Sequence, residues 1–208
     1  MEGNDEKEIV PPQVEGSKKD IEHQVQTQDE NDARKLFNIA RNRLLSVNHW
    51  EDFSSPARFG LVDEAGKELT RTVEKGDYFK IAIGAPGPNE GDGYDWVFVE
   101  EIDDNSNPNG HEEHLALRAR PSRNPQAKEN DDTAHFFDDV ATSSFVVSRS
   151  GTTVKAAVYG RNEKPNTQTS DTIDKVRNAV VGATAILGLS NIEWNSLVKG
   201  LLNTHANP

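Results

Sequence analysis

Residues Tyr78–Ile83 read YFKIAI and alternate strictly between two kinds of position. Phe79, Ile81 and Ile83 fall on one side of an extended chain, with more polar positions on the other, which is typical of a half-buried β-strand. The next segment of this kind, Tyr94–Ile102, is apolar on both sides at its centre. Such a pattern predicts a strand at the middle of a sheet or beneath helices.

Further segments with a two-residue period lie on both sides of this pair and are separated by turns or polar loops. They are residues 59–63, 69–73, 115–120, 144–149 and 152–159. No crossover helix is expected between them, only a short helical turn at residues 134–141. Strands that follow one another without crossover helices pair in antiparallel fashion. The sequence therefore predicts a curved antiparallel sheet or half-barrel of about seven strands.

Helical periodicity occurs at the two ends of this strand-rich region. Residues 32–47 repeat apolar side chains at steps of three and four, and residues 170–187 do the same. Ser190–Glu193 reads as a capping box that opens a second C-terminal helix. We expect one N-terminal and two C-terminal helices to pack on the sheet, which gives an α+β fold with a helix-grip-like layout.

The first 31 residues differ in composition from the rest of the chain. They carry nine acidic residues and three lysines, half of the net charge of −12 of the whole protein, and Pro11-Pro12 interrupts any helix. Such a segment offers too little apolar surface to offset the entropy of ordering. We therefore expect a disordered acidic tail over residues 1–31 and a single α+β domain over residues 32–208.

The overall composition excludes several classes of protein. A net charge of −12 argues against nucleic-acid partners, which need a basic surface, and against docking on anionic membranes. The lack of cysteine removes disulfides, thiolate nucleophiles and cysteine-ligated zinc. It fits a reducing cytoplasm, and it also fits an exported protein that has lost its signal. No stretch approaches the roughly 20 apolar residues of a membrane span.

The order of the elements is similar to the helix-grip arrangement of START-type proteins, which bind lipids and other hydrophobic ligands. In that arrangement a curved antiparallel sheet wraps a long C-terminal helix and leaves a pocket between them. The similarity lies in element order, without a shared motif. It implies a cavity between the sheet and the helix at residues 170–187.

The strands contain more large apolar residues than one face of a sheet needs, which favours a cavity with apolar walls. Arg118 and Arg120 share one strand face and offer guanidinium groups to an anionic or polar part of a ligand. The expected ligand-binding residues are Phe79, Ile81, Trp96, Phe98, Leu117, Arg118, Arg120, Phe145 and Val180.

Catalytic and metal sites receive little support from the sequence. His135 precedes Asp138, and a histidine beside carboxylates can perform acid–base chemistry. His111–His114 lacks the helical H-E-x-x-H spacing of a zinc protease, and the acidic loop after Asp103 departs from EF-hand spacing. We expect no metal and no cofactor, with His135 and Asp138 as weak catalytic candidates.

Three functions remain open from the sequence. The first is a non-catalytic binding module for a small hydrophobic or amphipathic ligand, held between the sheet and the C-terminal helix. The second is a protein-interaction or structural domain with a filled core. The third is a cyclase- or hydrolase-like enzyme that uses His135, Asp138 and Arg118. The identity of a ligand or of a protein partner does not follow from the sequence.

Overall fold

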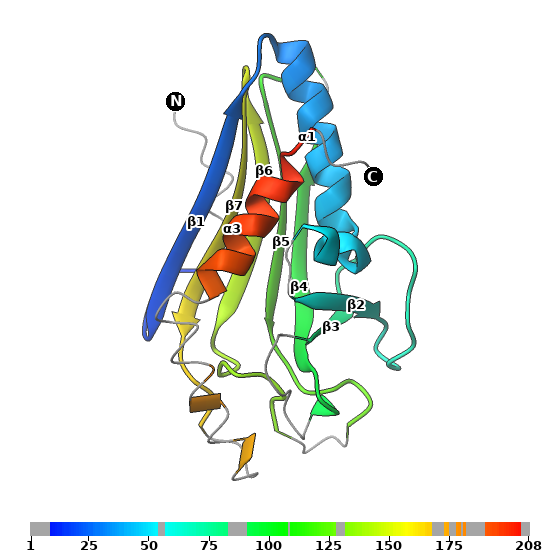
Figure 1. Cartoon of the computed structure of the whole chain (residues 1–208), viewed down its shortest axis with the longest axis vertical. Coiled ribbons are helices and arrows are strands. Elements are labelled where there is room, and N and C mark those ends of the chain that lie inside the picture. The colour runs from blue at the N-terminus through cyan, green and yellow to red at the C-terminus, as the bar shows by residue number, and fades with distance from the viewer. Residues whose placement is uncertain are drawn as a thin grey trace.

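The computed structural model describes residues 9–53, 57–82, 91–107, 109–127, 132–167, 173–174, 178–179, 181 and 190–204. Seven strands, two α-helices and one 3-10 helix follow one another along these residues (Figure 1). In chain order they are β1 Ser17–Gln26, α1 Glu30–Leu45, η1 Val47–Asp52, β2 Arg58–Val62, β3 Tyr78–Ala82, β4 Asp95–Asn105, β5 Glu112–Pro121, β6 Thr142–Ser150, β7 Thr153–Glu163 and α3 Ser190–Leu201.

The strands form one open sheet in the order β1-β7-β6-β5-β4-β3-β2, and every neighbouring pair is antiparallel. From β2 to β7 each strand lies beside its neighbour in sequence, because turns and loops join them. The hairpin between β6 and β7 turns at Gly151, whose φ of 58° is a conformation that glycine adopts readily. The prediction of an antiparallel α+β fold with seven strands is therefore confirmed.

Helices cover one face of this sheet, which we call the inner face; the opposite one is the outer face. Figure 1 shows α1 and α3 lying on the same side of the long strands. Two register shifts, at Ser17/Lys19 in β1 and at Val99/Glu101 in β4, interrupt the pairing. Bulges of this kind bend the strand that carries them.

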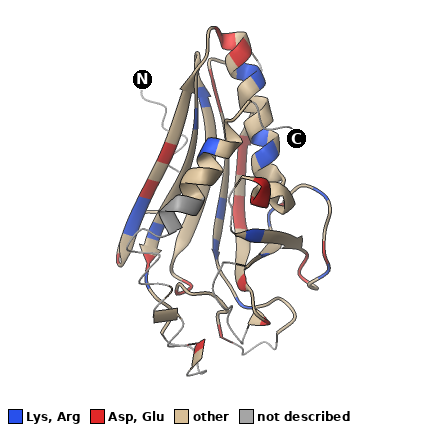
Figure 2. Ribbon diagram, viewed as in Figure 1, with Lys and Arg blue, Asp and Glu red and all other residues tan. Residues whose placement is uncertain are grey.

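The start of α1 is fixed by Asp29, whose side chain accepts a hydrogen bond from the backbone N–H of Asp32 at 2.9 Å. Acidic side chains occupy the first turn of the helix and Arg43 the last, an order that suits the helix dipole (Figure 2). The helix begins two residues earlier than the sequence predicts, because Asp29 caps it.

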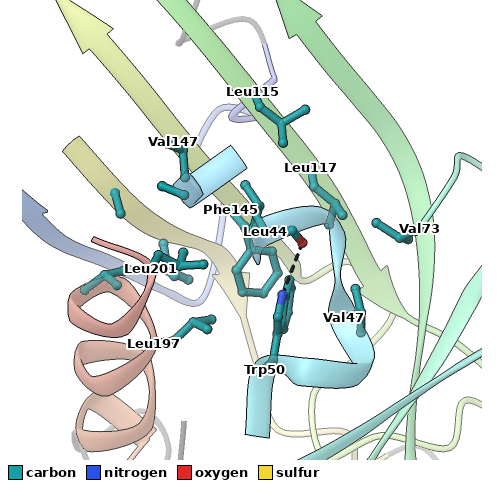
Figure 3. Close-up of a cluster of buried hydrophobic side chains, with 14 of the residues drawn as sticks. Leu44, Val47, Trp50, Val73, Leu115, Leu117, Phe145, Val147, Leu197 and Leu201 are labelled. Carbon is teal, nitrogen blue, oxygen red and sulfur yellow. Dashed lines mark hydrogen bonds between the residues drawn. The ribbon is translucent and has the colours of Figure 1, made fainter. Parts of the chain in front are cut away.

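The main core lies between the inner face and the two helices. Trp50 from η1 is fully buried, and its indole N–H donates to the backbone carbonyl of Leu44 at 3.1 Å (Figure 3). Its ring meets that of Phe145 on β6 with centroids 4.8 Å apart. On the other side of Phe145, Leu197 and Leu201 of α3 complete the packing.

The expectation of a disordered tail over residues 1–31 is wrong from Ile9 onward; residues 1–8 lie outside the described residues. β1 (Ser17–Gln26) pairs along β7 and places Ile21 and Val25 on the inner face. Its exposed positions are polar, as the edge of a sheet favours, so its composition resembles that of a linker.

Residues 9–16, which we call the N-terminal strap, run over the outer face. Ile9 is 2% exposed and packs against Ala116 and Val146. Its carbonyl accepts hydrogen bonds from Arg118 and from Ser144, both at 3.1 Å. The strap is therefore an ordered part of the fold that covers the centre of the outer face.

Two other expected elements are replaced by irregular chain. Residues 69–73 form no strand; Glu68 makes an isolated bridge to Val62, and the N–H of Val73 then donates to the carbonyl of Leu45. This contact draws the chain back toward the end of α1 and prevents a second paired strand. Residues 134–141 are not helical either.

The predicted helix over residues 170–187 falls largely outside the described residues. Within the part that is described, residues 173, 174, 178, 179 and 181 are helical. Ile173 is 70% exposed whereas Asp174 and Asn178 are buried, so Ile173 does not belong to a buried apolar stripe. Among the described residues, no helix is long and apolar enough to cross a membrane.

Candidate functional site

A cavity of about 50 Å³ lies on the inner face where α3 crosses the sheet. Aromatic rings form most of its wall, with Phe59 on β2, Phe79 on β3, Phe145 on β6 and Trp194 on α3. Among the described residues, the lining also includes Ala57, Ile81, Val97, Ala119, Phe136 and Phe137, together with the polar residues His135, Ser143 and Glu163. We call this space the aromatic cavity.

The alternation of the strands explains why these residues meet. Phe79 and Ile81 on β3, Val97 on β4 and Ala119 on β5 point to the inner face, as period 2 requires. Trp194 is half-buried and closes the cavity from the helix side, with its ring centroid 5.4 Å from that of Phe145. The cavity is thus lined by residues of six strands, β2 to β7, and of helix α3.

His135 is held in a fixed orientation at the cavity wall. The backbone N–H of Phe137 donates to its Nδ1 at 2.9 Å, and its ring stacks on Phe136 with centroids 4.3 Å apart. Asn166 donates to the backbone carbonyl of His135 at 3.2 Å. Because Nδ1 accepts a hydrogen bond, the neutral ring carries its proton on Nε2.

Glu163 brings a carboxylate to the same cavity, although it is 5% exposed. Burial raises its pKa above the ordinary value, and the charges of Lys19 and Arg161 act in the opposite direction without cancelling this effect. The hydroxyl of Ser17 donates to its Oε2 at 3.3 Å. The aromatic cavity therefore contains one acidic group in surroundings that disfavour its charge.

Two local features of β7 bring Glu163 to the inner face. Asn162 has a φ of 55°, a left-handed conformation that interrupts the alternation of the strand just before Glu163. Gly160 makes space for the carboxylate, since a Cβ at that position would lie 2.2 Å from Glu163 Oε1. Sequence periodicity does not reveal Glu163, because the strand pattern changes at Asn162.

Three of the predicted ligand-binding residues, Phe79, Ile81 and Phe145, line the aromatic cavity. Leu117 lies on the inner face but deeper in the packed core. The prediction for Trp96 and Phe98 needs correction, because both side chains lie on the outer face. Trp96 packs with Val62 and Ala134, and Phe98 packs against the ring of Tyr78 at 5.1 Å.

Arg118 and Arg120 also lie on the outer face, so they are not part of a cavity beneath a helix. Arg118 donates to Glu100 at 2.9 Å and to Glu101 at 2.8 Å, and Arg120 pairs with Glu100. Arg149 lies on the inner face, where it pairs with Glu113. The sheet therefore separates Arg149 from Arg118 and Arg120.

The weak catalytic candidates do not form a site with Arg118, which is on the opposite side of the sheet. Asp138 follows His135 in an irregular segment, where its backbone N–H donates to the carbonyl of Lys164. Asp138 and Asp139 lie close together, and their hydrogen bond raises the pKa of Asp139. His135 is thus the one member of the predicted catalytic set that lines the cavity.

Val180, the last of the predicted ligand-binding residues, lies outside the described residues, so its role in binding stays a prediction. Among the residues that the structure describes, no group of three or more histidines and carboxylates could hold a metal ion.

A second, wider hollow of about 460 Å³ runs along the edge of β2, between η1 and residues 68–70. Lys80 crosses it, with its ammonium 2.9 Å from Glu68 and 5.0 Å from the ring centre of Tyr94. Arg58 and Glu51 lie at its rim. Charges of both signs line this hollow, and it lacks the aromatic enclosure of the first cavity.

Comparisons with known proteins add structural neighbours without a family. No family model and no curated protein matches the sequence. The extracellular domain of PknH from Mycobacterium tuberculosis gives a TM-score of 0.36 at 7% identity, with 84% of this chain and 60% of that chain covered. Protein Ms6760 from Mycobacterium smegmatis gives 0.38 at 12% identity, with 91% and 93% covered.

Norcoclaurine synthase from Thalictrum flavum is a third neighbour, with a TM-score of 0.33, 12% identity, and 90% of this chain and 88% of that chain covered. Ginseng major latex-like protein 151 from Panax ginseng gives 0.31 at 11% identity, with 86% and 99% covered. At these identities the activities and ligands of the neighbours are not assigned to this chain. The chain covers 60% of the PknH domain's length.

Proposed function

We propose that the protein binds a small hydrophobic ligand in the aromatic cavity. The observation that carries this proposal is the enclosure of one cavity by aromatic rings, among them those of Phe59, Phe79, Phe145 and Trp194, with a few polar groups between them. Binding sites for small molecules have this composition: apolar walls give affinity and a few polar groups give orientation.

The size of the cavity sets a condition on binding. An engineered apolar cavity of about 150 Å³ takes up benzene, so the space of about 50 Å³ is roughly a third of what a ring needs. Among the rings of Phe59, Phe79, Phe145 and Trp194, that of Trp194 is half-buried and comes from the helix rather than the sheet. A ligand the size of one aromatic ring therefore enters by displacing the side chain of Trp194.

The proposal is tested with benzyl alcohol, a neutral probe of one ring, by NMR titration of the backbone amides. We expect saturable shifts that centre on the strands bearing Phe79 and Phe145. A119V adds two methyl groups to a residue that lines the cavity and should abolish these shifts. A116V makes the same change on the same strand but on the outer face, and should keep them.

Two results would contradict the proposal. One is the absence of saturable binding by benzyl alcohol at millimolar concentration in the wild-type protein. The other is equal binding by the wild type and a folded A119V variant. Native mass spectrometry of the purified protein gives an independent reading, because a retained small molecule appears as added mass that A119V should lose.

A further inference from the structure

The side chain of Glu163 is placed as a recognition group rather than as a packing residue. It is 5% exposed, lines the aromatic cavity, and has Ser17 as a neutral hydrogen-bond donor to Oε2 at 3.3 Å. A buried carboxylate is costly unless it is paired and fully hydrogen-bonded. This cavity therefore contains an acid that its protein surroundings stabilise incompletely.

The neighbouring positive charges do not remove this imbalance. Arg161 is engaged elsewhere, since its NH1 donates to Asp20 at 2.6 Å and to the carbonyls of Lys19 and Gly160. Lys19 is half-buried on β1, opposite Gly160. Both charges lower the pKa of Glu163, yet burial outweighs them and the net shift is upward. A further positive charge near the carboxylate would thus be favourable.

The rest of the cavity wall also favours a positively charged group. Aromatic faces attract cations through their ring quadrupoles, more strongly when water is excluded. Phe79, Phe145 and Trp194 surround the space into which Glu163 reaches, and His135 in its neutral form adds no positive charge. Lysine and arginine are absent from the described residues of the lining, so an anionic ligand would meet the carboxylate without a cation from these residues to offset it.

We propose that the ligand of the aromatic cavity is a hydrophobic amine, with its ammonium group on Glu163 and its apolar body against the aromatic rings. This inference rests on the proposed function, because it assigns the chemical class of the ligand to the same cavity. It goes further in that it makes Glu163, which strand periodicity does not predict as a cavity residue, the residue that determines specificity.

A matched set of probes tests this assignment by isothermal titration calorimetry. Benzylamine, benzyl alcohol and benzoate share one ring and differ in the charge of the substituent. We expect benzylamine to bind about ten-fold more tightly than benzyl alcohol, as a charge-assisted hydrogen bond allows, and benzoate to bind more weakly than either. E163Q should bring the affinity for benzylamine to that for benzyl alcohol.

The control variant is E64Q, which makes the same change at an exposed turn and should leave the preference for the amine intact. Equal affinity of the wild type for benzylamine and benzyl alcohol would overturn the assignment of an amine while leaving the cavity as a binding site. So would an amine preference that persists in folded E163Q. If none of the three probes binds, the proposed function itself fails.

Discussion

Arg149 donates from its Nε to Oε2 of Glu113 at 2.6 Å, and both side chains are buried on the inner face. The two residues face each other across β5 and β6. The two terminal guanidinium nitrogens of Arg149 donate to the backbone carbonyls of Gly110 and Gly151, at 2.6 and 3.1 Å. Arg149 thus connects the β6–β7 hairpin to the loop before β5. Arg34 of α1 contacts the same loop, because it also donates to the carbonyl of Gly110.

This ion pair should be costly to break from one side. E113A leaves a buried guanidinium without its partner, so we expect a loss of about 3 kcal/mol or more in the free energy of unfolding. E113L/R149M removes both charges and should lose less than E113A alone. Urea denaturation of the two variants and the wild type measures both quantities.

The control for this comparison is K35A, which removes a surface partner of Asp32 and should leave the unfolding midpoint unchanged. A double variant that is less stable than E113A would contradict the reasoning, because it would show that the pair stabilises the protein beyond the satisfaction of its own charges.

The N-terminal strap should contribute to stability through Ile9. I9A shortens a side chain that is 2% exposed and packs against Ala116 and Val146. We expect the free energy of unfolding to fall by about 2 kcal/mol, which is at the lower end for a buried isoleucine because the strap can shift into the space left behind. V14A changes a residue of the same strap that is 80% exposed and should have no effect. Thermal unfolding distinguishes the two variants; equal midpoints would show that the strap adds nothing.

The parts of the fold that the sequence predicts are those in which one local pattern dominates. β3 alternates cleanly between buried and half-buried positions, and α1 repeats its buried Leu36, Ala40 and Leu44 at helical spacing, so these elements follow from periodicity. β1 carries polar residues at most positions because it is an edge strand, and its pairing with β7 depends on the fold as a whole. Local composition cannot show such a strand.

The candidate site was predictable only to the extent that strand alternation decides which face a residue takes. Phe79, Ile81 and Phe145 follow that rule and line the cavity. Trp96 and Phe98 share one face of a strand that is apolar on both faces, and the sequence does not say which face the helices cover. Glu163 reaches the inner face because the left-handed backbone at Asn162 interrupts the alternation of β7. This backbone conformation leaves no periodic pattern in the sequence.

Trp194 should limit access to the aromatic cavity. W194A removes the half-buried ring that closes it from α3, and the enlarged space should bind benzyl alcohol more tightly by about ten-fold, while the free energy of unfolding falls by roughly 2 kcal/mol. NMR titration measures the affinity and urea denaturation the stability. W194F is the conservative control, and its affinity and stability should lie between those of the wild type and W194A. An affinity that stays unchanged in folded W194A would show that the ring does not obstruct the ligand.

The pH dependence of stability should report on Glu163. Burial raises its pKa above the ordinary value of 4.5, while Lys19 and Arg161 act against this shift. Below the ordinary value the group is protonated in both folded and unfolded protein and costs nothing. As the pH rises through the folded pKa, the folded protein must either bind a proton or bear a desolvated charge, so stability falls.

E163Q lacks this ionisation and can still accept the hydrogen bond from Ser17. We therefore expect E163Q to match the wild type near about pH 4 and to exceed its stability increasingly toward about pH 8. Urea midpoints across that range test the prediction, with E64Q as the exposed control. A difference that is independent of pH, or that decreases as the pH rises, would show that the carboxylate is well compensated in the folded protein.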